Sequence, residues 1–98
     1  MKNENNFAFH QKSYLCMHVF ENVKPVLLVS RIDGDWCFLC GDKHPEDPSA
    51  YRVVEMGHVL ARHPDLHKVM DLLPDEEARR LEVGGPWMRT KLPTVQWY

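Results

Sequence analysis

The stretch Val26-Leu27-Leu28-Val29-Ser30-Arg31-Ile32-Asp33-Gly34-Asp35-Trp36-Cys37-Phe38-Leu39-Cys40 decides the fold. It holds two runs of β-branched, aromatic and aliphatic residues, and the Asp-Gly between them is among the strongest short signals for a hairpin turn. We therefore expect two neighbouring antiparallel strands. Alternation places Trp36, Phe38 and Cys40 on one face of the second strand, and Cys37 and Leu39 on the other.

The residues before this hairpin predict one further strand. Residues alternate from Ser13 to Phe20, which is typical of a strand and puts Cys16 and His18 on the same side. Residues 1–12 are mostly polar and show no periodicity, so we expect a loose arm whose few aromatic side chains dock on the domain.

The residues after the hairpin predict a loop, a short strand and two helices. Residues 41–49 are polar and contain two prolines, which is typical of a loop. Residues 51–54 favour a short strand. Helical spacing follows over about 56–73 and is interrupted by Pro64, which suits the first turn of a new helix. We expect two short helices there, the second with an apolar stripe made of Leu66, Val69, Met70 and Leu73.

Residues 75–83 are compatible with two structures. An acidic first turn followed by arginines favours a helix. The pair Gly84-Gly85 instead favours a hairpin, with a closing strand over about residues 87–91. We favour the hairpin.

These elements predict a single α+β domain over residues 13–91. Its expected parts are a small antiparallel sheet with a central hairpin (about 26–40), two short helices (about 56–73) on one face, and a C-terminal hairpin around Gly84-Gly85. Residues 92–98 form a tail that ends in Trp97 and Tyr98, two aromatic residues that are candidates for contact with a partner.

Composition excludes several functional classes. A chain of 98 residues suffices for one core, and 44% apolar with 27% charged residues is typical of a globular protein. Twelve basic and 14 acidic residues give a net charge of -2, which argues against nucleic acid as a partner. No apolar stretch approaches the roughly 20 residues of a membrane helix, and the first residues lack the apolar core of a signal peptide. We expect a cytoplasmic protein that does not bind a membrane.

The three cysteines lie in two clusters that also carry histidine. If the strand after Ser13 and the strand after Asp35 lie side by side, Cys16, His18, Cys40 and His44 could close a tetrahedral Cys2His2 zinc site. Cys37 is an alternative ligand if the chain turns at Phe38-Leu39. The usual zinc pattern of paired CxxC or HxxxH motifs is absent.

Two other interpretations of these residues remain open. Cysteine is among the most buried residue types, so Cys16 and Cys40 are compatible with simple core packing. The second interpretation is a reactive thiol, with Cys40 as a nucleophile and His44 or His58 as its base. No local sequence motif supports this pairing. A redox CxxC would need a helix N-terminus, whereas Cys37 falls in a predicted strand.

Several short motifs carry a resemblance over about residues 14 to 90. They are Cys16-Met17-His18-Val19, Pro25–Ser30, Asp33-Gly34-Asp35-Trp36 with Phe38–Gly41, and Ala78-Arg79 with Pro86-Trp87. Together they resemble small bacterial hypothetical proteins that have no established activity. More distantly, the chain is similar to a bacterial family of unknown function grouped with proposed immunity proteins of toxin systems. The distant family does not keep cysteines at positions 37 and 40, so the zinc hypothesis depends on this chain's own residues.

The resemblance implies a protein that acts by binding another protein. Our first functional hypothesis is therefore a non-enzymatic bacterial interaction protein, immunity-like in the sense of the distant family. The second is a small zinc-stabilised module, and the third a cysteine-dependent enzyme. The carboxylates at positions 42, 46, 47 and 75–77 are typical of an ordinary solvated surface; the alternative is an anionic surface that would suit a basic partner.

Overall fold

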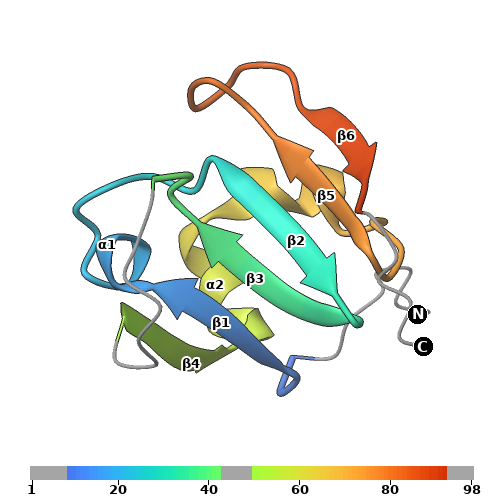
Figure 1. Cartoon of the computed structure of the whole chain (residues 1–98). Helices are drawn as coiled ribbons and strands as arrows, with labels where there is room; N and C mark the ends of the chain where they lie inside the picture. Colours follow the sequence, from blue (N-terminus) through green and yellow to red (C-terminus); the bar gives the residue numbers. More distant parts are fainter. Residues whose placement is uncertain (1–8, 43–49, 93–98) are drawn as a thin grey trace.

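A computed structural model describes residues 9–42 and 50–92, which form a mixed α+β fold (Figure 1). Its elements in chain order are β1 (Lys12–Cys16), α1 (Met17–Phe20), β2 (Leu28–Ile32), β3 (Asp35–Leu39), β4 (Tyr51–Glu55), α2 (Met56–Arg62), the 3-10 helix η2 (Pro64–Val69), β5 (Glu76–Arg79) and β6 (Met88–Lys91). The strands make one sheet in the order β4-β1-β3-β2-β5-β6, and α2 lies behind it in Figure 1. The sheet is antiparallel, as predicted, except that β1 and β3 run parallel.

The central hairpin is confirmed. β2 pairs with β3 from Leu28 opposite Leu39 to Ile32 opposite Asp35. The two turn residues, Asp33 and Gly34, both have positive φ angles, 53° and 87°, which are the angles of a type I′ turn and match the right-handed twist of the strands.

The predicted alternation along β3 is also confirmed. Trp36 and Phe38 are fully buried on the face toward the helices, and Cys40, just after the strand, is buried as well. Cys37 and Leu39 are half-buried and line a hollow on the other face.

The strand predicted over residues 13–20 is wrong beyond Cys16. β1 has partners on both sides only as far as β3 and β4 extend: Leu15 pairs with Phe38, and Cys16 pairs with Tyr51. Beyond that point the chain makes the single helical turn α1, which buries Val19.

Two short helices follow β4, as predicted, but the second is a 3-10 helix that begins at Pro64. A 3-10 helix has three residues per turn, and the two buried side chains of η2, Leu66 and Val69, are three positions apart; Met70 and Leu72, beyond its end, are buried as well. The predicted stripe ended instead at Leu73, which is exposed, because it assumed the α-helical period.

The C-terminal hairpin is confirmed, and the helical alternative for residues 75–83 is wrong. β5 pairs with β6 from Glu76 opposite Lys91 to Arg79 opposite Met88. Its other edge pairs with β2 over residues 77–79, so β5 is hydrogen-bonded within the sheet on both sides.

Residues 9–11 run beside the start of α2. The Gly57 amide donates to the Phe9 carbonyl, and the Met56 amide donates to the Gln11 carbonyl. The rest of the predicted arm, His44, Trp97 and Tyr98 lie outside the described residues. Within residues 9–42 and 50–92, no helix is both long and apolar enough to cross a membrane.

Candidate metal centre

The candidate site lies where the chain leaves two adjacent parallel strands. Cys16 is the last residue of β1, and Cys40 directly follows β3. The parallel register sets Leu15 beside Phe38, so these two strands end at the same edge of the sheet. Cysteines 24 positions apart in the sequence are thereby brought together.

The short helix α1 adds a histidine to this pair. Cys16 precedes the helix with extended backbone angles, and His18 is the second helical residue. The ligand atoms of Cys16, His18 and Cys40 all lie within 4.8 Å of one another. Among the described residues, these three form the group of cysteine, histidine and carboxylate side chains that could hold a metal ion.

One distance in this group matches a metal site closely. Zinc–sulfur bonds of about 2.3 Å and zinc–nitrogen bonds of about 2.0 Å at a tetrahedral angle put sulfur and nitrogen roughly 3.5 Å apart. The Cys40 Sγ lies 3.5 Å from the His18 Nδ1. The same arithmetic puts two sulfurs about 3.8 Å apart, so no pair in the group needs to close by more than about 1.3 Å.

The site is largely shielded from water. Cys16 is fully buried, Cys40 is buried and His18 is half-buried. Burial raises the pKa of the Cys40 thiol, and the neighbouring Cys16 raises it further, while a backbone hydrogen bond from Asp42 acts in the opposite direction. Until a metal ion displaces it, the Cys40 thiol therefore keeps its proton at neutral pH.

A charged pair borders the site. The Lys24 ammonium donates to the Asp42 carboxylate, which raises the pKa of Lys24. Lys24 also interacts electrostatically with both Cys16 and Cys40. Sequence reasoning did not identify this pair, since residues 18 positions apart in two loops carry no local signal.

Of the residues predicted as ligands, the structure brings Cys16, His18 and Cys40 together. It places Cys37 apart from them, on the opposite face of β3, because the strand does not turn at Phe38-Leu39. His44 lies outside the described residues, so its place in the site stays a prediction.

The geometry of the group also bears on a nucleophilic role. The Cys40 sulfur and the His18 imidazole are in contact, as a cysteine and its base would be. Nucleophilic cysteines, however, have a lowered pKa, whereas that of Cys40 is raised. The thiols are better suited to metal binding, since a metal ion displaces the proton that burial retains.

Comparisons with protein-family models, with curated proteins and with solved structures found no match to this chain. The candidate site is therefore defined by its own geometry and by the chemistry of its donor atoms.

Proposed function

We propose that this protein is a small metal-binding module that holds one zinc ion through Cys16, His18 and Cys40. The observation that carries the proposal is the convergence of two sulfurs and an imidazole within 4.8 Å at the ends of two parallel strands. Two thiolates with an imidazole are a donor set that suits zinc, because sulfur and nitrogen are its usual protein ligands.

The zinc ion would be structural. Its buried ligands leave little room for a substrate, and structural zinc sites are closed by a fourth protein ligand. We propose His44 for that position, as the sequence predicts. The ion would then join the β1–α1 corner to the end of β3 and to the segment that carries His44.

The test measures zinc binding on the full chain. We expect native mass spectrometry and elemental analysis to find one zinc ion per chain, and titration with Co²⁺ to give the absorption bands of cobalt–thiolate bonds. Cys16→Ser and Cys40→Ser should each weaken binding by more than the roughly 10–100-fold that loss of an outer-shell partner costs. Affinity should rise with pH, since both thiols must release their protons.

Cys37→Ser is the matched control, because Cys37 is a cysteine of the same domain on the opposite face of β3. It should bind zinc as tightly as the original chain. Binding that is absent in the original chain, or that is weakened equally by all three cysteine substitutions, would disprove the proposed site. His44→Ala tests the fourth ligand separately.

A second function has its own support. The resemblance of this chain implies a bacterial interaction protein with a protein partner, and the sheet face away from α2 carries exposed apolar side chains, among them Ile32 and Val53. We propose that partner binding is the role in the cell and that the metal stabilises the fold that performs it. Capture of a specific partner by the tagged chain, retained in a Glu82→Gln variant whose change is exposed and lies outside that sheet face, would support this role.

A further inference from the structure

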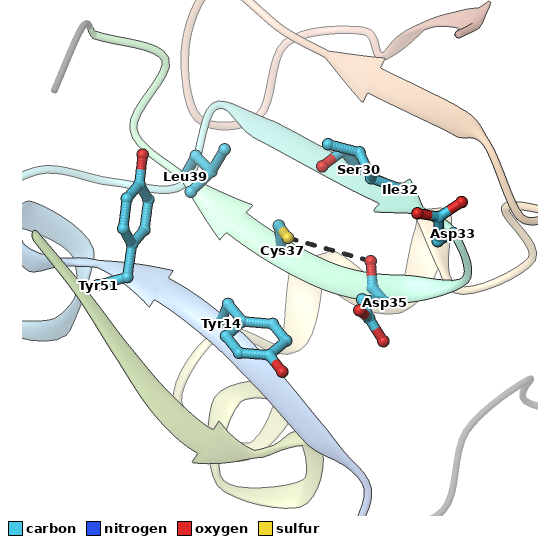
Figure 2. Close-up of a pocket in the computed structure, with 8 residues that line it drawn as sticks. All are labelled: Tyr14, Ser30, Ile32, Asp33, Asp35, Cys37, Leu39 and Tyr51. Carbon is cyan, nitrogen blue, oxygen red and sulfur yellow. Dashed lines mark hydrogen bonds between the residues drawn. The ribbon is translucent and has the colours of Figure 1, made fainter. Parts of the chain in front are cut away.

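The sheet face opposite α2 contains a hollow of about 490 Å³ (Figure 2). Four strands and the central turn contribute to it, and its lining residues are Tyr14, Ser30, Ile32, Asp33, Asp35, Cys37, Leu39 and Tyr51. The size falls within the range of ligand-binding pockets, about 300–1,000 Å³.

Most of the lining is apolar or aromatic. The rings of Tyr14 and Tyr51 project from neighbouring strands on one side of the hollow, and Leu39 and Ile32 lie across from them (Figure 2). Beyond its edge the apolar surface continues to Val53, which pairs with Tyr14 on the same face and is 58% exposed. An apolar area that extends past the hollow suits a protein segment better than a small molecule.

Two carboxylates stand at one end of the hollow. Asp33 and Asp35 flank the turn between β2 and β3, and within the described part of the chain neither carboxylate forms an ion pair or a hydrogen bond. Asp71, by contrast, is paired with Arg89. Among residues 9–42 and 50–92, no lysine, arginine or histidine lines the hollow, so its described lining carries negative charge only.

A buried hydroxyl provides an independent sign of a missing ligand. Ser30 lines the hollow and is only 3% exposed, and its Oγ has no nitrogen or oxygen partner among residues 9–42 and 50–92; it interacts only with the Cys37 thiol, a weak hydrogen-bonding group. Buried polar atoms nearly always have such a partner in native proteins. The neighbouring Cys37 is half-buried, and burial raises the pKa of its thiol, so it remains uncharged in the floor.

We propose that this hollow docks a segment of a partner protein that inserts an arginine side chain beside an apolar residue. The guanidinium would meet the Asp33 and Asp35 carboxylates, and its planar group and aliphatic stem would lie along the tyrosine rings. The Ser30 hydroxyl would supply one further hydrogen bond to the segment. Arginine fits better than lysine, because a planar cation can both stack on an aromatic ring and pair with carboxylates.

The test uses the full chain, isotopically labelled with nitrogen-15, and two short probes. The first is the peptide acetyl-Leu-Arg-Phe-amide, and the second carries citrulline in place of arginine, which keeps the shape and removes the charge. Amide signals of β2, β3 and the turn should shift on addition of the arginine peptide. We expect the arginine peptide to bind about tenfold more tightly than the citrulline peptide.

The double variant Asp33→Asn, Asp35→Asn should remove that preference. Asparagine tolerates the positive φ of position 33, so the turn should be retained. Glu82→Gln, an exposed carboxylate outside the hollow, is the matched control and should keep the tenfold preference. If the double variant fails to fold, added salt gives the same information with the original chain, because it should reduce the preference for arginine.

Three results would overturn the proposal. The first is the absence of shifts with the arginine peptide throughout the millimolar range. The second is equal binding of the two peptides, or shifts that map to the helical side of the sheet. The third is a mass that doubles with protein concentration while the signals of this face broaden, which would mean that a second copy of the chain covers the hollow.

Discussion

Arg80 offers the sharpest test of how this small fold is held together. It is 4% exposed, and its Nε and Nη2 donate to the Val26 carbonyl at 3.1 and 2.9 Å. Its Nη1 lies 2.6 Å from the Asp65 carboxylate, and the guanidinium sits 4.3 Å from the centre of the Trp87 ring. One cation thereby joins the loop before β2, η2 and the C-terminal hairpin.

The substitution Arg80→Met keeps most of the aliphatic stem and removes the cation. The charged hydrogen bonds to the Val26 carbonyl contribute about 1.5–3 kcal/mol. The ion pair adds at most about 1 kcal/mol because the Asp65 side chain is 38% exposed, and the contact with Trp87 adds roughly 0.5–1 kcal/mol. Part of this loss of stability is offset, because folding no longer has to remove a charged side chain from water. We expect a net loss of about 3 kcal/mol, which corresponds to a Tm lower by at least roughly 12 °C.

The assay is urea unfolding of the full chain followed by circular dichroism. Arg79→Met is the matched control, since Arg79 is the adjacent residue and is exposed, and its effect should stay within about 0.5 kcal/mol. Asp65→Asn isolates the ion pair and should cost no more than about 1 kcal/mol. A loss below about 1 kcal/mol for Arg80→Met, or equal losses at positions 79 and 80, would refute the assignment of Arg80 as the central contact.

Three further predictions concern other parts of the molecule. A Cβ at Gly57 would lie 2.0 Å from the Phe9 ring, so Gly57→Ala should destabilise the protein by about 1 kcal/mol. The same substitution should cost much less in a Phe9→Ala background, and a double-mutant cycle measures the difference between the two losses. Burial lowers the pKa of His63 from 6.5, so just below that pH the unfolded chain binds more protons than the folded chain. Stability should therefore fall as the pH drops through this window. In His63→Gln, the midpoints of urea unfolding should change less across the same pH range. If free zinc is present at 100 times its Kd, a chelator should lower the free energy of unfolding by about 2.7 kcal/mol, measured in thermal melts. The chelator should not change the stability of Cys40→Ser.

Features set by neighbouring residues could be predicted from the sequence. The turn at Asp33-Gly34 and the alternation along β3 follow from local residue types, and Gly84-Gly85 marked the C-terminal hairpin correctly against a competing helix signal. Features set by distant residues could not. Nothing local to Cys16 shows that β1 loses its neighbours there and turns into α1, because that depends on where β3 and β4 end.

The candidate metal site shows the same division. Cys16, His18 and Cys40 were named from residue type and spacing, but their meeting was conditional on a pairing of β1 with β3 that no local pattern encodes. The predicted anionic surface shows what distant contacts change. Asp42 pairs with Lys24, while Asp75 and Glu76 accept backbone amides of Asp33 and Leu73. These carboxylates thus already have partners within the chain. Among the described residues, the Asp33 and Asp35 carboxylates form no ion pair and no hydrogen bond.

The position of β1 between β3 and β4 has a consequence for synthesis on the ribosome. Of the described strands, β1 leaves the exit tunnel before any other, yet both strands that flank it are translated later. The β2–β3 hairpin can close as soon as it emerges, and only then does β1 gain its first neighbour. The nascent chain must therefore carry Leu15 and Cys16 without strand partners until β3 has been synthesised.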